Sequence, residues 1–320
     1  MTTTSIELLW DAIRQDTRIN PLQESDCKLV RIDLPTAFDI FAGIDSSGRA
    51  IVAFSTNSKP PVIDFETGAL DYFRQARLNG QWMMALRLNS ENLQQVFGRL
   101  CQDLIDESRS VLTEAGLISL LRERLLLWKR LFGQNDDGLL KSHQIKGLLG
   151  ELLALEEFGL EFQDTPHSLV LTWIGPDGGN QDFLFSNRAV EIKSISPSTE
   201  EISISSPEQL DCALPLELHL YVLKESTPKQ ERSVSLNSQV ARMENILNTS
   251  PDALKTFRQK LLTVGYVENS YYDTVTFVLM ETKRYLVSEQ FPKIVNSMLP
   301  NGISRLSYGI FLSSIAPYQI

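Results

Sequence analysis

Three carboxylates and one lysine, Glu151, Asp182, Glu191 and Lys193, are the residues of this sequence best suited to chemistry. Ionised carboxylates about 5 Å apart repel one another by roughly 3 kcal/mol per pair at an effective dielectric constant near 20. A divalent cation relieves that repulsion, and oxygen ligands completed by solvent suit Mg²⁺ or Mn²⁺ better than zinc. The residue types therefore predict a metal-dependent site, if the fold brings them together.

Glu191 and Lys193 lie two positions apart in the largely apolar segment 189–195. Because side chains alternate along a β-strand, a strand here places both charged groups on one face. The same alternation points Val190 and Ile192 into the core. A carboxylate and an ammonium are thus delivered to a single site.

A β-hairpin over 181–195 would add Asp182 to that face. We predict a turn with Asn187 and Arg188 as its two central residues. Asp182 then lies opposite Lys193, with both side chains on the same side of the sheet. A four-residue turn keeps this convergence, whereas a three-residue turn would put Asp182 on the other face.

Glu151 lies in a helix that we predict over 142–158. Gly147 and Gly150 each cost this helix about 1 kcal/mol of intrinsic stability. Glycine at these positions would let the helix approach the sheet closely. That approach would bring Glu151 toward the two strand carboxylates.

These elements belong to the second part of a chain that divides at the polar segment 133–138. We expect a β-rich N-terminal domain (1–90), a helical connector and linker (91–138), and an α/β domain with a mixed central sheet flanked by helices (139–320). The other expected elements are a helix at 6–14, strands at 38–44, 50–56, 72–78 and 81–88, helices at 91–107 and 114–132 capped by Ser90 and Thr113, a strand near 169–173, a strand at 216–224, helices at 238–247 and 252–262, and strands at 274–282 and 305–313.

Composition narrows the class of protein. A chain of 320 residues that is 42% hydrophobic can bury a sizeable core, which excludes a disordered protein. The formal net charge of −10 excludes a basic coat for nucleic acid. Three widely spaced cysteines argue against a disulfide frame or a zinc ribbon. With neither a bilayer-spanning apolar run nor a secretory signal, we expect a cytoplasmic protein.

The order of Glu151, Asp182 and Glu191-Ile192-Lys193, on helix, strand and strand, resembles the PD-(D/E)XK nuclease superfamily. A closer similarity is to a bacterial group known as PD-(D/E)XK motif proteins. It rests on Gly147-Leu148-Leu149-Gly150-Glu151-Leu152, Trp173, Gly175-Pro176, Gly178-Gly179, Gln181-Asp182-Phe183 and Gly265-Tyr266, and it extends over most of the chain.

Pro176-Asp177 could be mistaken for the "PD" of the motif. Asp177, however, precedes Glu191 by 14 residues and lies in a glycine-rich loop. Asp182 lies inside the hairpin, so we take Asp182 as the motif aspartate.

The resemblance implies a restriction-endonuclease-like fold and a Mg²⁺-dependent endonuclease that hydrolyses DNA phosphodiester bonds, in a bacterial restriction or phage-defence system. Asp182, Glu191 and the Ile192 carbonyl would bind Mg²⁺ or Mn²⁺. Lys193 would orient the attacking water and offset charge in the transition state. Glu151 would act through a metal-bound water or a second ion.

DNA contacts must come from local patches, because both halves of the chain are acidic. The candidate nucleic-acid-binding residues are His143, Lys146, Ser205, Ser206 and Gln209, together with the basic stretch 224–260. A solvated helix start explains His143 and Lys146 equally well, and an N-cap with a polar helix start explains the other three.

Two other functions are compatible with the same residues. The chain could be a DNA-binding or assembly subunit of a defence complex, with a nuclease that only a partner activates, and the acidic net charge favours this reading. It could also cleave RNA or branched DNA. A homodimer or a defence-system partner would complete the basic surface that the single chain lacks.

Overall fold

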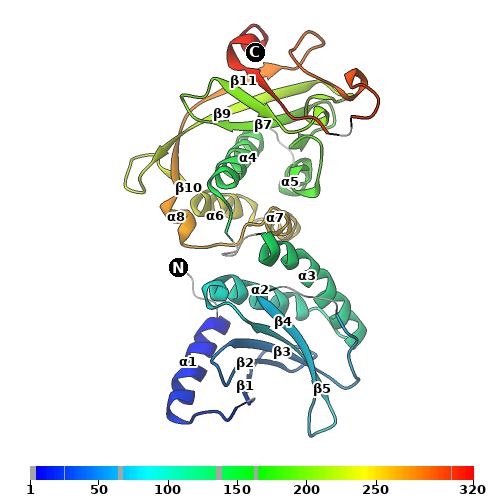
Figure 1. Cartoon of the computed structure of the whole chain (residues 1–320), viewed down its shortest axis with the longest axis vertical. Helices are drawn as coiled ribbons and strands as arrows, with labels where there is room; N and C mark the ends of the chain where they lie inside the picture. The colour runs from blue at the N-terminus through cyan, green and yellow to red at the C-terminus, as the bar shows by residue number, and fades with distance from the viewer. Residues whose placement is uncertain (1–4, 25, 64–67, 135–138, 162–164, 304) are drawn as a thin grey trace. The chain divides into compact units, whose positions relative to one another are not determined.

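The computed structural model describes residues 5–24, 26–63, 68–134, 139–161, 165–303 and 305–320 (Figure 1). It contains two compact units, Met1–Leu139 and Leu140–Ile320. No helix in the described ranges is both long and apolar enough to cross a membrane. The expected mixed α/β fold is confirmed, with helices and strands in both units.

The first unit is an antiparallel sheet with strand order β1-β2-β3-β5-β4, joined by three main helices. Trp10 of the first helix is fully buried, and its indole N–H donates to the Ile51 carbonyl (2.9 Å). Its ring stacks on Phe97 of the second helix, with centroids 5.3 Å apart. The elements are α1 (Ser5–Ile19), β1 (Cys27–Arg31), β2 (Ile40–Asp45), β3 (Ala50–Thr56), β4 (Leu70–Ala76), β5 (Trp82–Leu88), η1 (Glu91–Leu93), α2 (Gln94–Ser108) and α3 (Glu114–Gln134).

Local sequence signals explain most of these boundaries. The Asn79-Gly80 turn joins β4 to β5, and Gly80 takes the left-handed φ of +84° that this turn needs. Thr113 caps α3 by accepting the Gly116 N–H (3.2 Å). Ser90 forms no side-chain cap, which corrects our expectation, because the 3₁₀ turn η1 comes before α2. Strand β1 was not predicted.

The second unit is built on a mixed sheet with strand order β10-β11-β9-β7-β6, in which only β7 and β9 run parallel. A separate two-stranded sheet pairs β12 with β8. The elements are α4 (Ser142–Glu161), α5 (Pro166–Thr172), η2 (Gly175–Asp177), β6 (Phe183–Leu184), β7 (Ala189–Ile195), β8 (Glu201–Ile204), η3 (Pro207–Leu210), β9 (Leu216–Ser226), β10 (Val234–Ser235), α6 (Leu236–Leu247), α7 (Pro251–Thr263), α8 (Tyr271–Thr274), β11 (Thr276–Leu286), η4 (Asn296–Met298), β12 (Tyr308–Phe311), α9 (Leu312–Ile315) and η5 (Ala316–Tyr318).

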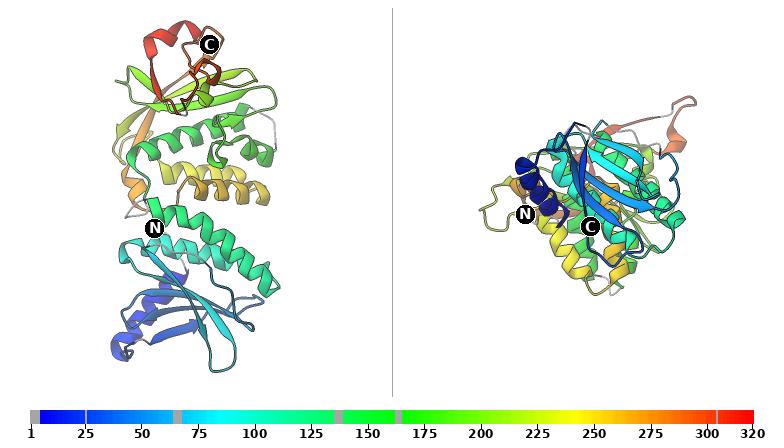
Figure 2. Two further views of the ribbon diagram at one scale, coloured as in Figure 1. Left: turned by 45° about the vertical axis from the view of Figure 1, so that its right-hand side comes forward. Right: turned by 90° about the horizontal axis from the view of Figure 1, so that it is seen from below.

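Helices cover one face of this mixed sheet in two layers (Figure 2). The first layer contains α4, which contacts β7, and the second contains α6 and α7. The other face buries an apolar cluster beneath β8, β12 and α9, with Leu218 and Leu220 of β9 at its centre. Both faces of β7 are therefore covered by other elements, whereas its edge toward β6 pairs with a strand of only two residues.

Most of the segment near 169–173 belongs to the helix α5, which ends at Thr172, rather than to the predicted strand. Trp173 forms an isolated antiparallel bridge with Phe183. The apolar run of the segment is typical of either structure, but Thr165 caps the helix by accepting the Ser168 N–H (3.2 Å). Pro166 occupies the first turn, where its missing N–H costs nothing. Thr165 and Pro166 therefore favour a helix over a strand in this segment.

Gly150 allows α4 to approach β7, as predicted, but Gly147 does not take part. A Cβ atom on Gly150 would lie 2.0 Å from Ser194 Oγ and 3.6 Å from Ile192 Cγ2. A Cβ atom on Gly147 would meet nothing within 4 Å. Close packing against the site strand thus requires glycine at one position only.

We expect Gly150→Val to destabilise the protein by about 2 kcal/mol, because overpacking of this kind typically costs 1–3 kcal/mol. The matched variant Gly147→Val should change the free energy of unfolding by less than about 0.5 kcal/mol, since valine fits open space and favours helix slightly over glycine. Urea unfolding of both variants measures the difference. Equal effects would mean that Gly150 does not control the distance between α4 and β7.

Candidate active site

The β6–β7 hairpin has a register that differs from the predicted one. Phe183 pairs with Val190 and Leu184 with Ala189. The next pair is Phe185 with Arg188, because the Phe185 N–H donates to the Arg188 carbonyl (2.8 Å). The central turn residues are therefore 186 and 187, not the predicted Asn187 and Arg188.

This correction shifts the pairing by two positions and leaves the faces unchanged. Continued by one residue, the observed register puts Asp182 across from Glu191 instead of Lys193. Since side chains repeat every second residue, a shift of two keeps Asp182 on the same side as Glu191 and Lys193. The predicted convergence survives because moving the turn by one residue shifts the pairing of the two strands by two residues, an even number.

Asp182 takes the place of a strand residue at the open edge of β7. Strand β6 contains only two residues, and beyond it Asp182 Oδ2 accepts the backbone N–H of Ile192 (2.8 Å). Its own carbonyl accepts the N–H groups of Ile174 and Gly175 (2.9 and 3.0 Å). Both the backbone and the carboxylate of Asp182 are thus fixed at the edge of the sheet.

Glu191 is the most deeply buried acid of the site, with 1% of its surface exposed. Lys193 Nζ lies 2.9 Å from Glu191 Oε1. The other oxygen, Oε2, is buried and has no hydrogen-bond partner among the described residues. Burial and the neighbouring Asp182 carboxylate raise the pKa of Glu191 well above its ordinary value, against the opposite effect of Lys193.

Glu151 approaches from α4, where it is partly buried. Its Oε2 accepts the indole N–H of Trp173 (2.8 Å). Burial, and then the Asp182 carboxylate, raise the pKa of Glu151 to about 8. Burial likewise raises the pKa of Asp182 to about 6, although the Ile192 N–H and Lys193 act in the opposite direction. The structure therefore brings all four predicted site residues into one electrostatic cluster.

Gly175 leaves a gap between two of these carboxylates. A Cβ atom at this position would lie 3.0 Å from Asp182 Oδ1 and 3.5 Å from Glu151 Oε2. Any larger residue would fill the space in which the two oxygens face each other. Glycine at position 175 thus keeps this space open between the two carboxylates.

The residues present fit a hard divalent cation. The donors are all oxygen atoms, one of them is orphaned on Glu191, and the gap at Gly175 separates two more. In the described part of the chain, no group of three or more His, Cys, Asp or Glu residues is arranged so that it could hold a metal ion. A cation held here would therefore need backbone and solvent oxygens in addition to carboxylates.

A family model described as "Putative PD-(D/E)XK family member (DUF4420)" matches residues 6–313. The chain belongs to this family. Comparison with curated proteins and with solved structures found no match. The family match confirms the resemblance that the sequence carries and indicates a nuclease-like function.

In this PD-(D/E)XK family member, Gln209 holds the motif lysine, and Gln181 anchors the turn that contains Gln209. Gln209 Oε1 accepts from Lys193 Nζ (3.1 Å) and from the Ser205 N–H (2.8 Å). The buried side chain of Gln181 donates to the Glu208 carbonyl (2.7 Å), which ties η3 to the hairpin. Sequence reasoning missed this role of Gln181, and it interpreted Gln209 either as a nucleic-acid contact or as part of a polar helix start.

The glycine-rich loop 175–179 is held by α7. Lys260, which is 4% exposed, donates to the Trp173 carbonyl (2.6 Å) and forms an ion pair with Asp177. Asp177 thus neutralises a buried lysine, while Asp182 joins the carboxylate cluster. The basic stretch 224–260 contributes its last lysine to the interior and not to a DNA-binding surface.

The remaining predicted contact residues differ in how accessible they are. His143 and Ser205 are exposed, and Ser206 is partly exposed. Lys146 is half-buried, and its Nζ donates to Ser196 Oγ (2.6 Å). Burial lowers the pKa of Lys146. His219 is fully buried and bonds to Glu217 (2.7 Å).

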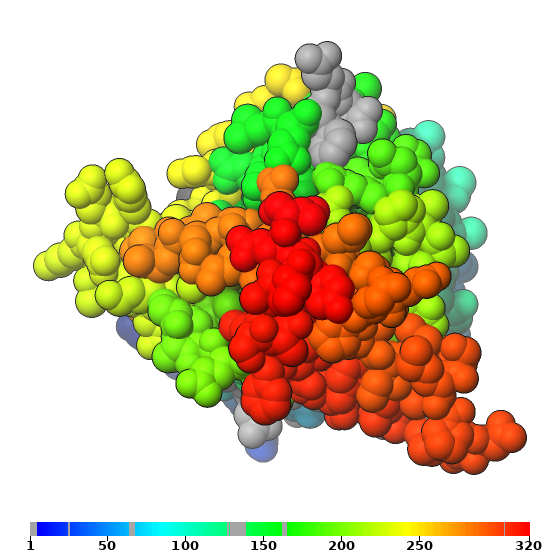
Figure 3. Space-filling model, turned by 90° about the horizontal axis from the view of Figure 1, so that it is seen from above, coloured from blue at the N-terminus to red at the C-terminus, as the bar shows by residue number. Residues whose placement is uncertain are grey.

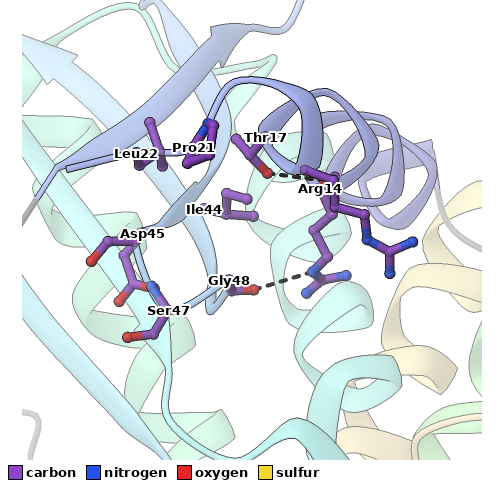
Figure 4. A pocket seen from close by; sticks show the side chains of 10 residues that line it. Arg14, Thr17, Pro21, Leu22, Ile44, Asp45, Ser47 and Gly48 are labelled. Atoms are coloured by element: carbon purple, nitrogen blue, oxygen red, sulfur yellow. Dashed lines mark hydrogen bonds between the residues drawn. The ribbon is translucent and has the colours of Figure 1, made fainter. Parts of the chain in front are cut away.

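A pocket of about 320 Å³ lies in the first unit, between the end of α1 and the β2–β3 turn (Figure 4). Arg14 lines it, but its guanidinium donates to the Gly48 carbonyl (3.1 Å) and to Gln94 (2.8 Å). Asp45, also in the lining, accepts from Arg49 (2.7 Å). These two charged groups are satisfied within the protein, and the predicted site residues are not among those that line the pocket.

Proposed function

We propose that this protein is a Mg²⁺- or Mn²⁺-dependent endonuclease that hydrolyses DNA phosphodiester bonds. The observation that carries the proposal is the convergence of Asp182, Glu191 and Lys193 at the open edge of β7, with an orphaned carboxylate oxygen on Glu191. Membership of a PD-(D/E)XK family supports the same chemistry.

Asp182, Glu191 and the Ile192 carbonyl would hold the cation. The N–H and C=O groups of one strand residue point to the same side of the strand. Because the Ile192 N–H faces Asp182 at the sheet edge, the Ile192 carbonyl faces that edge too. Glu151, across the gap at Gly175, would reach the cation through water or hold a second ion. When bound, the cation polarises the phosphate and makes water a stronger acid.

Lys193 would orient the attacking water and offset the charge that develops on the phosphate. Its ammonium has three N–H donors, and two of them meet Glu191 and Gln209. One donor therefore remains for water or a phosphate oxygen. The two protein acceptors fix its direction, which is the condition for catalysis by a preorganised charge.

Gln209 should be a positioning residue for Lys193. We expect Gln209→Ala to lower the rate of DNA cleavage by about 10- to 100-fold, as is typical when an outer partner of a site group is lost. The affinity for Mg²⁺ should stay within about twofold, because no carboxylate changes. Single-turnover cleavage and calorimetry measure the two effects. Gln230→Ala, at an exposed position, is the matched control, and equal rates in both variants would contradict the role.

A second candidate is a subunit of a restriction or phage-defence complex whose nuclease works only with a partner. The net charge of −10 and the internal contacts of Lys146 and Lys260 favour it, because few cations remain near the site to attract DNA. Such a partner, or a second copy of the chain, would supply the missing basic surface.

Purified protein incubated with plasmid DNA, linear DNA, branched DNA and RNA tests the proposal. We expect nicking or cutting of DNA with Mg²⁺ or Mn²⁺ and none with a chelator. Cleavage of RNA but not of DNA would mean that RNA, and not DNA, is the substrate. A protein that binds Mg²⁺ and cuts none of the four substrates would favour the partner-dependent candidate.

A further inference from the structure

The last part of the chain has an unusual charge. Asp and Glu make up 40 of the 320 residues, one in eight, yet no Asp or Glu occurs from Gln290 to Ile320. The same stretch contains Lys293 and Arg305. The net charge of the protein is −10, but this segment has no carboxylate of its own that would repel a polyanion.

Part of this stretch, residues 293–303, forms a projection that we call the arm. It lies between β11 and β12 and contains the 3₁₀ turn η4. Figure 3 shows it in orange, standing out from the surface of the second unit. Met298 is 61% exposed and Ile303 47%. Pro300 and Asn301 between them are exposed as well. Apolar side chains thus crowd an exposed tip.

The base of the arm is fixed to the domain. The hydroxyl of Tyr308 accepts the Ile294 N–H (3.0 Å) and lies 3.3 Å from the Ile294 carbonyl. Phe291, just before the arm, is buried and packs edge-on against Tyr318, with centroids 5.2 Å apart. An exposed apolar tip on a fixed base is suited to insertion into a partner.

The arm is anchored beside the candidate active site. Asn296 Nδ2 donates to Glu208 Oε1 (2.8 Å). Glu208 directly precedes Gln209, whose side chain holds Lys193. The Glu208 carbonyl also holds Gln181, the neighbour of Asp182. A molecule bound at the site therefore lies next to the base of the arm.

We propose that the arm inserts its tip into the minor groove of duplex DNA next to the phosphate that is cut. Proteins that bind this groove use Met, Leu, Ile and Pro as wedges between base steps, with Arg, Lys or Asn beside them. Met298, Leu299, Pro300 and Ile303 supply the wedge, and Asn301 is the polar residue within it. Lys293 and Arg305, one on each side of the tip, would meet the phosphates that line the groove.

The charge of the arm favours DNA over a protein partner. A surface that docks a protein tolerates carboxylates at its rim. An arm between two rows of phosphates does not, because each carboxylate there would be repelled from both sides. Glu208, whose carboxylate accepts from Asn296, lies at the base of the arm and not at its tip. This inference rests on the proposed function, since it places the arm by the site at which DNA would be cut.

The test compares two exposed methionines. Binding of a 30-base-pair duplex is measured by gel shift in Ca²⁺, which replaces Mg²⁺ without cleavage. We expect Met298→Glu to weaken binding at least tenfold and Met280→Glu, at a 56% exposed position on β11, to change it less than twofold. The double variant Lys293→Ala/Arg305→Ala should lower the slope of log Kd against log salt by roughly 1.8, at about 0.9 for each lost phosphate contact.

A dye that occupies the minor groove of an A·T-rich duplex identifies the groove, because wild-type protein should displace it and Met298→Glu should not. Wild-type protein that cuts DNA with Mg²⁺ while Met298→Glu binds equally tightly would overturn the arm and leave the nuclease standing. Equal losses in Met298→Glu and Met280→Glu would also overturn it. Wild-type protein that neither binds nor cuts duplex DNA would overturn both proposals.

Discussion

Glu191→Gln is expected to reduce Mg²⁺-dependent DNA cleavage by at least about a thousandfold and to stabilise the metal-free protein. The carboxylate is buried, one of its oxygens has no partner among the described residues, and Asp182 adds to the cost of its charge. An amide of the same shape removes that charge. Lys193 compensates this charge only in part, and removing a buried charge from a functional site commonly raises stability by on the order of 1 kcal/mol.

Loss of cleavage together with a gain in stability distinguishes a metal ligand from a structural residue. A residue with a purely structural role would lose stability and activity together, whereas a metal ligand loses activity and gains stability without metal. Thermal unfolding with a chelator and plasmid cleavage with Mg²⁺ measure the two effects. Glu200→Gln, at an exposed acid after β7, is the control and should change neither. Cleavage by Glu191→Gln at the wild-type rate would remove Glu191 from the site.

Asp182 and Lys193 should behave differently from Glu191 in stability. Asp182→Ala removes the acceptor of the Ile192 N–H at the sheet edge, so its gain from lost repulsion is partly offset. Lys193→Ala leaves Glu191 buried without its cation, which should destabilise the fold at neutral pH. Both variants should be inactive, and the order of their stabilities separates the three roles.

The site could be predicted from the sequence because it depends on the regular alternation of side chains along β-strands. Side chains alternate along any β-strand, so a shift of the pairing by two residues leaves each side chain on the same face. Asp182, Glu191 and Lys193 therefore converge in both the predicted and the observed register. The register itself could not be read. Asn187 favours several turn positions equally, and the choice made in the structure moves Asp182 from Lys193 to Glu191.

Tertiary contacts account for what the sequence did not indicate. The indole of Trp173 reaches Glu151 from the residue directly after α5, in a segment that we expected to be a strand. Gln181 and Gln209 act through bonds to groups 16 to 27 residues away. Nothing in their local pattern distinguishes them from surface glutamines. Burial of Gln181 is the signal that could have found it, and burial is known only after folding.

The metal-free protein is expected to lose stability as the pH rises from about 4 to 8. The pKa of Glu151 is about 8 in the fold against an ordinary 4.5, and that of Asp182 about 6 against 3.8. Between these values the folded chain binds protons that the unfolded chain has released. The free energy of unfolding therefore falls with rising pH, and the contribution is fully present only below the ordinary pKa values. Urea unfolding with a chelator at several pH values should show a loss of several kcal/mol, at about 1.4 kcal/mol per pKa unit.

Mg²⁺ should reverse this dependence, because it binds the same oxygens only after their protons leave. Its affinity should therefore rise from pH 6 to pH 8, and each ion bound should release protons, which calorimetry in two buffers of different ionisation enthalpy detects. Asp182→Asn should lose both the binding and the release, while Asp211→Asn, at an exposed acid, should keep them. An affinity for Mg²⁺ that does not change with pH would mean that the cation binds away from the three buried carboxylates. The same carboxylates should both lower the stability at high pH and bind Mg²⁺. If added Mg²⁺ does not restore the stability lost at high pH, the cation binds elsewhere.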